Sequence, residues 1–295
     1  MLQLQDLAKL VAVHGQTPPP PVTDFALGGS DFEWAAGPAV MGVVNLSPDS
    51  WYRESVCLST TTAIERGYVL FAQGAAIVDI GAESTLAHAE RVDGANQNRR
   101  LIPVVEELAS GGVPVSVETY NAEVARACLE AGASLLNLTG TEQGDEIFHL
   151  AADHDAGVIL CFVPAANVRE AKELDLHDDP VPMLRDYFNR QIDQAVAAGV
   201  TRLFLDPGLG FYYSNLQDGP TRVRHQTRTF LNSFRLHELG WPVCNALPHA
   251  FEFFREEVRT AEPFFATLAA LGGTHLLRTH EVAKVKAVLD TMAVC

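Results

Sequence analysis

Apolar runs of strand length recur along this chain, and most of them end on or enclose a polar side chain. Seven runs do so, at Asn45, Glu83, Glu118, Asn137, Asp206, Asn245 and the pair Arg278/His280. An eighth run, GVILCFV, lies between the fourth and the fifth. Stretches of helical length and period separate the runs, among them 60–73, 122–131, 183–198 and 263–271. Runs that are apolar on both faces and alternate with helices are typical of a parallel sheet covered by helices.

Eight strand-and-helix units in a chain of 295 residues predict an α/β fold, and most simply a closed (β/α)8 TIM barrel. We expect residues 39–295 to form this barrel and residues 1–38 to form an N-terminal extension with a hairpin. Residues 1 to about 22 have the pattern of a short amphipathic helix followed by a proline run. The segment FALGGSDFEWAAGP is typical of a small hairpin that plugs the bottom of a barrel.

The positions of the polar side chains predict where the chemistry lies. In barrels of this kind active sites are built at the C-terminal ends of the strands. The polar residues that end the apolar runs fall at these ends. We therefore expect them to share one active-site rim.

The charge balance of the chain excludes several classes of partner. There are 21 basic and 37 acidic residues, for a net charge of −16. This surface repels phosphate backbones and anionic lipids, so neither nucleic acid nor a membrane is expected as a partner. No apolar stretch approaches the ~20 residues of a membrane span, and the N-terminus lacks the pattern of a signal peptide, so we expect a cytoplasmic protein.

Neither the cysteines nor the histidines have the spacing of a metal site. The five cysteines are widely spaced and include no C-x-x-C pair, which is typical of reduced structural thiols. His149 and His154 are five residues apart, as are His275 and His280, and this spacing does not place two ligands on one helix face. We therefore interpret the scattered histidines as surface or packing residues rather than metal ligands.

Four strings of residues, in order, resemble one known family. They are Asn45-Leu-Ser-Pro-Asp49-Ser50-Trp51, Asp79-Ile-Gly-Ala-Glu83-Ser84-Thr85, Asp206-Pro-Gly-Leu-Gly-Phe211 and Arg278-Thr-His280-Glu281. Between Met41 and Met292 the chain thus resembles the dihydropteroate synthase family. The resemblance implies a (β/α)8 barrel and a transferase of folate biosynthesis. Members condense 6-hydroxymethyl-7,8-dihydropterin diphosphate with p-aminobenzoate and release diphosphate.

The resemblance also implies which residues bind the pterin. Glu118, Asn137 and Asp206 are the residues expected at the pterin edge, whose N–H donors suit carboxylates and a side-chain amide. Considered alone, Asn137 and Asp206 also suit caps of the loops that follow their strands. Three further residues complete the expected substrate-binding set, namely Glu83, Thr85 and His249.

The expected catalytic residues are Asn45, Arg278 and His280. Asn45 resembles the asparagine that helps to hold Mg²⁺ and the diphosphate, and its amide oxygen is a hard ligand that suits this ion. Arg278 and His280 resemble the pair that contacts the pterin face and the anion. His280 also suits the start of the last helix, which is itself an anion site. The resemblance further suggests a homodimer through the late helices.

The chain departs from the family where the family carries positive charge. Leu86 and Ala87 replace an arginine and a proline, and His249 replaces the lysine of strand 7. On strand 3, Glu118 replaces an aspartate. Two further motifs differ, at Cys161-Phe162-Val163 and at Gly210-Phe211-Tyr212-Tyr213. These changes remove cations from the substrate face and predict a pterin pocket with an altered second-substrate and leaving-group site.

Three functions are compatible with these residues. The first is a divergent dihydropteroate synthase, the second a pterin-dependent methyltransferase, and the third a non-catalytic or re-purposed pterin-binding paralogue. The Asn45 loop favours the synthase, because methyl transfer has no use for a metal and diphosphate loop. Loss of the family's arginine and lysine favours the paralogue. Synthase activity is the main hypothesis.

Overall fold

Eight parallel strands form one sheet in the computed structural model, in the order β8-β7-β6-β5-β4-β3-β10-β9. Contacts between β8 and β9 close this sheet, because Leu205 bridges Val243 and its N–H donates to the Pro242 carbonyl at 2.9 Å. The strands are β3 (Ala39–Asn45), β4 (Ile77–Gly81), β5 (Val115–Glu118), β6 (Leu135–Leu138), β7 (Gly157–Cys161), β8 (Leu203–Asp206), β9 (Cys244–Ala246) and β10 (Leu276–Thr279). The predicted (β/α)8 barrel is confirmed.

The structure describes residues 1–15, 20–49, 52, 55–84, 91–170, 173–211 and 213–295. Of the positions singled out in the sequence, Thr85 lies outside the described residues. So do Ser50, Trp51, Leu86, Ala87 and Tyr212.

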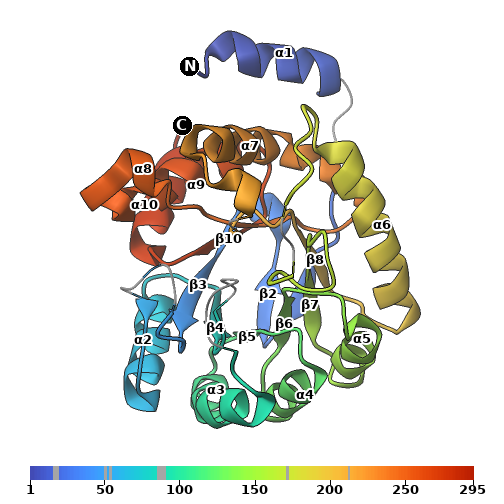
Figure 1. The fold of residues 1–295 in the computed structure, drawn as a ribbon, viewed down its shortest axis with the longest axis vertical. Coiled ribbons are helices and arrows are strands. Elements are labelled where there is room, and N and C mark those ends of the chain that lie inside the picture. Colours follow the sequence, from blue (N-terminus) through green and yellow to red (C-terminus); the bar gives the residue numbers. More distant parts are fainter. Residues whose placement is uncertain (16–19, 50–51, 53–54, 85–90, 171–172, 212) are drawn as a thin grey trace.

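Helices follow the strands and surround the barrel (Figure 1). They are α2 (Thr60–Ala72), α3 (Gly94–Ser110), α4 (Ala122–Glu130), α5 (Gly144–Asp153), α6 (Val181–Ala197), α7 (Gly219–Asn232), α8 (Phe251–Phe254), α9 (Ala261–Leu271) and α10 (Val282–Met292). Capping side chains fix where several of them begin, since Ser59, Asp93 and Asn121 each accept a backbone N–H of the first turn. The four helices predicted at 60–73, 122–131, 183–198 and 263–271 correspond to α2, α4, α6 and α9, with ends within two residues.

A hairpin seals the N-terminal end of the barrel. Its strands are β1 (Phe25–Leu27) and β2 (Ser30–Phe32), joined at Gly28 and Gly29, whose φ angles of 57° and 80° suit glycine. Leu27, Phe32 and Trp34 pack against the apolar side chains at the starts of the strands. The predicted plug is therefore present. The division into an extension of residues 1–38 and a barrel domain of residues 39–295 stays a prediction.

The strands change from apolar to polar along the inside of the barrel. Side chains two residues apart on a strand point to the same face. In four strands, an apolar side chain in the bottom layer is therefore followed two residues later by a polar side chain that also points into the barrel. The pairs are Ile77 and Asp79, Leu135 and Asn137, Phe204 and Asp206, and Leu276 and Arg278. This alternation builds a polar layer at the C-terminal end of the barrel.

Helix α1 (Leu4–His14) lies apart from the barrel, next to α7 (Figure 1). None of its residues is fully buried, and only Leu7 and Leu10 pack against the apolar cluster. The amphipathic helix predicted near the N-terminus is thus present, at Leu4–His14. Among the described helices none is long and apolar enough to cross a membrane.

Candidate active site

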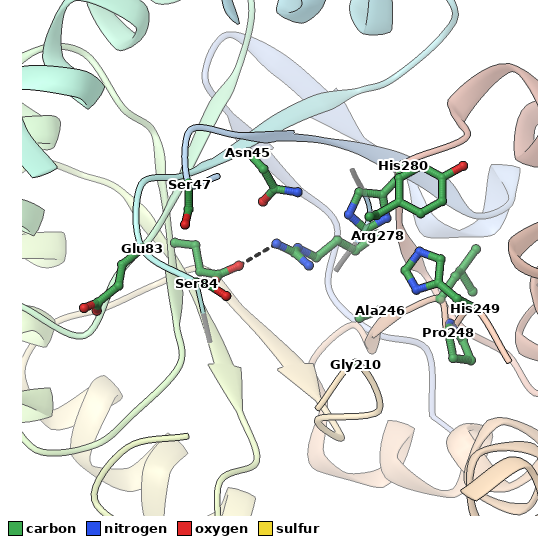
Figure 2. Close-up of a pocket in the computed structure, with 13 residues that line it drawn as sticks. Asn45, Ser47, Glu83, Ser84, Gly210, Ala246, Pro248, His249, Arg278 and His280 are labelled. Atoms are coloured by element: carbon green, nitrogen blue, oxygen red, sulfur yellow. Dashed lines mark hydrogen bonds and ion pairs between the residues drawn. The ribbon is translucent and has the colours of Figure 1, made fainter. Parts of the chain in front are cut away.

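A pocket lies at the C-terminal end of the barrel, among the loops that follow β3, β4, β9 and β10 (Figure 2). Six of the residues predicted from the sequence line it, namely Asn45, Glu83, Glu118, His249, Arg278 and His280. Asn137 and Asp206 are not among the described residues that line this pocket. They lie below it, in the polar layer of the strands. The structure therefore gathers these residues at one end of the barrel.

Arg278 occupies the centre of this polar layer. Its Nε donates to Asp79 Oδ2 at 2.7 Å, and its Nη2 donates to Glu118 Oε2 at 2.5 Å. Asp79 is fully buried and also accepts from Ser116 Oγ at 2.6 Å and from Asn137 Nδ2 at 3.2 Å. Burial of these charges is tolerated because each carboxylate is paired and hydrogen-bonded. The arginine and Asp79 thus tie together side chains of four strands.

Two acids of this layer bind protons more tightly than free carboxylates do. Burial raises the pKa of Glu118 to about 7, although the charge of Arg278 opposes the rise. Burial also raises the pKa of Asp206 to about 6, against the opposing hydrogen bond from the Gly208 N–H. Near neutral pH these groups can therefore accept hydrogen bonds as carboxylates or donate one as carboxylic acids.

The loop after β8 positions Asp206. Its Oδ1 accepts the Gly208 N–H at 2.8 Å. Gly208 has a φ of 76°, and a Cβ at this position would lie 2.5 Å from the Phe162 carbonyl oxygen. Only glycine suits both requirements, so the Asp-Pro-Gly sequence fixes this carboxylate at the strand end.

Asn45 and Glu83 are held by different partners. Asn45 Nδ2 donates to Ser55 Oγ at 2.6 Å, which orients the side-chain amide. Glu83 accepts from Tyr120 Oη at 2.9 Å and from the Val92 N–H at 3.0 Å. Its Oε1 also lies 3.0 Å from Nη1 of Arg169, a buried arginine of the loop after β7. A cation therefore lies beside the loop that follows β4, although the sequence of that loop itself lacks the family's arginine.

His249 and His280 meet around Glu262. Their ring nitrogens lie 3.0 Å and 2.7 Å from Glu262 Oε1, respectively. Although burial alone would raise the pKa of Glu262, the two histidines hold it well below its usual range. Burial lowers the pKa of His280. The ring of Tyr52, which also lines the pocket, lies 4.8 Å from each imidazole, between centroids.

Asn245 does not belong to the shared rim that the sequence predicts. It is fully buried, and its Nδ2 donates to Thr274 Oγ1 at 2.8 Å and contacts Ser233 Oγ at 3.3 Å. The inward-facing residue of β9 is its neighbour Cys244, which packs in the bottom layer of the barrel. A one-residue offset turns a strand side chain to the opposite face, so Asn245 points towards the surrounding helices.

The sequence interpretation missed three residues that hold the site together. Asp79 belongs to the second motif, and its two-residue spacing from Ile77 is the signal in the sequence that it points inwards. Arg169 and Glu262 carried no local signal. Arg169 reaches Glu83 from a loop that lies 86 positions further along the chain. Glu262 reaches His280 from the start of a helix.

The fold and the site define the class of protein as a (β/α)8-barrel enzyme with buried acids around one arginine at the strand ends. The sequence model of the family described as "Pterin binding enzyme" matches residues 41–280. The dihydropteroate synthase of Synechocystis sp. is 31% identical over 277 residues, which cover 90% of this chain and 91% of that protein. The dihydropteroate synthase of Mycobacterium leprae is 33% identical over 252 residues, covering 82% and 88%.

A solved structure extends the likeness to three dimensions. The dihydropteroate synthase of Xanthomonas albilineans with 4-aminobenzoic acid superposes with a TM-score of 0.76 at 31% identity, covering 93% of this chain and 98% of that one. This chain therefore belongs to the dihydropteroate synthase family of pterin-binding enzymes.

Proposed function

We propose that this chain condenses 6-hydroxymethyl-7,8-dihydropterin diphosphate with p-aminobenzoate, forming dihydropteroate and releasing diphosphate. The observation that carries this proposal is the similarity to synthases along nine-tenths of the chain. The relatives reported above all carry the synthase name, which favours a synthase over a methyltransferase or a non-catalytic paralogue. A cytoplasmic location and a homodimer stay predictions.

The polar layer is suited to the donor edge of a pterin. We assign Glu118, Asn137 and Asp206 to the ring N–H groups, because carboxylate and amide oxygens accept such donors bidentately. Arg278 is bonded to Asp79 and Glu118 and lies between the pocket and the deeper residues Asn137 and Asp206. Entry of the ring therefore requires its guanidinium to shift, and this planar cation then becomes free to lie against the ring face.

Asn45 fits the Mg²⁺ ion that the family implies. Its Nδ2 is used by Ser55, so the hard amide oxygen is the atom that faces a ligand. Mg²⁺ at phosphate sites commonly takes one or two protein oxygens and completes its shell with phosphate oxygens and water. Such an ion would neutralise charge on the departing diphosphate.

The remaining chemistry needs no covalent nucleophile from the protein. The bond between the pterin methylene and the diphosphate oxygen breaks, and the aryl amine forms the new bond to the methylene carbon and loses a proton. We assign Glu83 and His249 to substrate binding on opposite sides of the pocket (Figure 2), and Thr85, which lies outside the described residues, stays a predicted substrate-binding residue. His280 lies on the same wall as His249.

Turnover of the purified protein with both substrates and Mg²⁺ tests this proposal. We expect dihydropteroate to form, and Arg278→Gln to abolish its formation because the polar layer loses its central cation. Arg126→Gln provides the matched control, since Arg126 makes an exposed ion pair on the helical surface with Glu146. Tight binding of the pterin diphosphate without any product would contradict the proposal and support the paralogue.

A further inference from the structure

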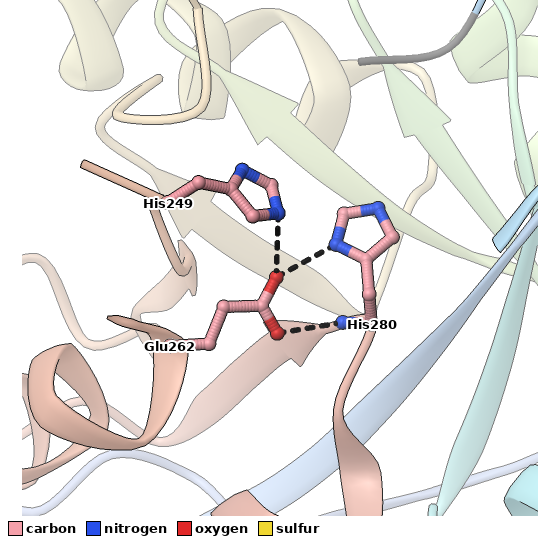
Figure 3. A group of neighbouring side chains, drawn as sticks. All are labelled: His249, Glu262 and His280. Carbon is pink, nitrogen blue, oxygen red and sulfur yellow. Dashed lines mark hydrogen bonds and ion pairs between the residues drawn. The ribbon is translucent and has the colours of Figure 1, made fainter. Parts of the chain in front are cut away.

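Three side chains from separate parts of the chain converge beside the pocket (Figure 3). His249 follows β9, Glu262 belongs to the first turn of α9, and His280 follows β10. One nitrogen of each imidazole and one carboxylate oxygen all lie within 4.8 Å of one another. Glu262 is fully buried, and His249 is 6% exposed. The group is therefore a compact cluster of ligand-type atoms at the pocket wall.

The carboxylate is already aimed at the two histidines. Glu262 Oε2 accepts the His280 N–H at 2.9 Å and the Glu281 N–H at 3.2 Å, and it also accepts from Thr279 Oγ1. These bonds fix the side chain and leave Oε1 facing the imidazoles. Oriented ligands of this kind are typical of metal sites, where hydrogen bonds to the outer atoms hold each ligand in place.

Hydrogen bonds alone leave this cluster incomplete. His280 Nδ1 is bonded to Glu262 Oε1 at 2.7 Å. His249 Nε2 lies 3.0 Å from the same oxygen, yet outside hydrogen-bonding geometry, and this buried nitrogen makes no hydrogen bond to any described residue. A buried nitrogen whose close contact with a carboxylate oxygen lacks hydrogen-bonding geometry is incompletely satisfied, so it is suited to a ligand that the protein itself does not supply.

We propose that His249, Glu262 and His280 bind a divalent transition-metal ion, and that Zn²⁺ fits this site. Two imidazole nitrogens and one carboxylate are a ligand set of catalytic zinc sites, whereas Mg²⁺ prefers oxygen ligands alone. A tetrahedral zinc ion with bonds of about 2.0–2.2 Å holds neighbouring ligand atoms roughly 3.3 Å apart. The two nitrogen–oxygen separations, 3.0 Å and 2.7 Å, are somewhat shorter than this value, and all three ligand atoms lie within 4.8 Å of one another, so side-chain rotations complete the site.

Three protein ligands leave at least one coordination position open. Because His249 and His280 also line the pocket, this position faces the substrate side. We assign it to a substrate oxyanion, a role that rests on the proposed function. The ion would supply positive charge at the strand-7 position, where His249 stands in place of the family's lysine. The metal site itself does not depend on turnover.

Metal titration of the full chain after treatment with a chelator tests the site. We expect Zn²⁺ to bind with a stoichiometry of one by calorimetry, and Co²⁺ to give the visible absorption of a tetrahedral complex with nitrogen ligands. Loss of a group that merely supports a metal ligand costs about 10–100-fold in affinity, so His249→Ala and His280→Ala should each weaken binding by at least about tenfold. Absence of Zn²⁺ binding to the wild-type chain would overturn the proposal.

His154→Ala is the matched control, because His154 is exposed at the end of α5 and outside the cluster. Unchanged Zn²⁺ affinity in both cluster variants, or equal loss in the control, would also overturn the proposed site. Inorganic diphosphate then tests the open position and should shift the Co²⁺ spectrum. A metal complex whose spectrum ignores diphosphate would overturn the oxyanion role and leave a purely structural ion. Each readout is independent of whether dihydropteroate forms.

Discussion

Arg278 is the residue on which the geometry of the site depends. It bonds two acids of neighbouring strands and lies between the pocket and the deeper residues Asn137 and Asp206. Because Arg278 is already paired with two carboxylates, it has little capacity left for an anionic ligand. The strong negative charge of the chain also opposes such a ligand. Ligand binding must therefore exchange one set of charged hydrogen bonds for another.

The carboxylate of Asp206 is predicted to be essential for pterin binding. Asp206→Asn keeps the size of the side chain but replaces one acceptor oxygen by a donor, which faces the N–H groups of the ligand. An unpaired buried group costs about 1–3 kcal/mol, so affinity should fall by roughly 5–150-fold. Calorimetry with 6-hydroxymethylpterin measures the change, and Asp153→Asn on the exposed side of α5 is the control. Wild-type affinity in Asp206→Asn would remove this residue from the pterin site.

The pKa of Glu118 predicts how stability depends on pH. Burial raises this pKa from 4.5 to about 7, so between these values the folded chain holds a proton that the unfolded chain has lost. The free energy of unfolding must then fall as pH rises through this window. In Glu118→Gln this contribution is absent, so the variant should gain stability relative to wild type between pH 5 and 7, by about 2–3 kcal/mol.

Urea denaturation of both proteins at several pH values measures this difference. Burial lowers the pKa of His225 to about 4 and that of His275 to about 3, so these histidines make stability rise with pH up to their unfolded value of 6.5, but they are common to both proteins and cancel. A difference that stays constant or shrinks with rising pH would contradict the assignment.

At the scale of elements, the segment from β9 to α9 is the irregular part of the barrel. The short helix α8 is flanked by Ala250 and Arg255, whose φ angles of 46° and 48° are unfavourable for residues with a side chain. This segment carries His249 at one end and Glu262 at the other. Backbone strain of this kind is often retained at functional sites, where it fixes side-chain placement.

Relief of the strain at Arg255 should stabilise the protein. Arg255 is exposed and combines its positive φ with a ψ of −118°. Arg255→Gly removes the clash of the Cβ and should raise the free energy of unfolding by about 1 kcal/mol. Glu256→Gly, at the next position, lacks this benefit and should lower stability. Denaturant titration compares the two, and equal effects would show that the backbone at Arg255 is not strained in solution.

For the whole molecule, net charge sets how fast an anionic substrate arrives. A chain of charge −16 repels the pterin diphosphate at long range. Raising NaCl from about 20 to about 200 mM shortens the Debye length and should increase the association rate by roughly two- to tenfold. Stopped-flow fluorescence measures this rate. Uncharged 6-hydroxymethylpterin should show no such change, and a rate that falls with salt would locate a dominant positive field at the pocket mouth.

The sequence determined the barrel and most of the strand-end residues. Both follow from local periodicity, because apolar runs of strand length alternate with helices, and a polar residue at the end of a run reaches the C-terminal edge of a parallel sheet. Asn45, Glu118 and Arg278 were found in this way and line one pocket. The sequence also shows the departures from the family directly, because each is a change of residue at a motif position.

Only the tertiary structure decided which side chains meet. The face of Asn245 depended on the exact phase of β9, which three residues are too short to reveal. The pairing of Arg169 with Glu83 and the cluster of His249, Glu262 and His280 join segments far apart in the chain. Spacing along a helix is one way to bring two ligands together, and closure of a barrel is another. Closure of a barrel produces no periodic pattern in the sequence, because its contacts arise from strand order and loop length rather than from any local repeat.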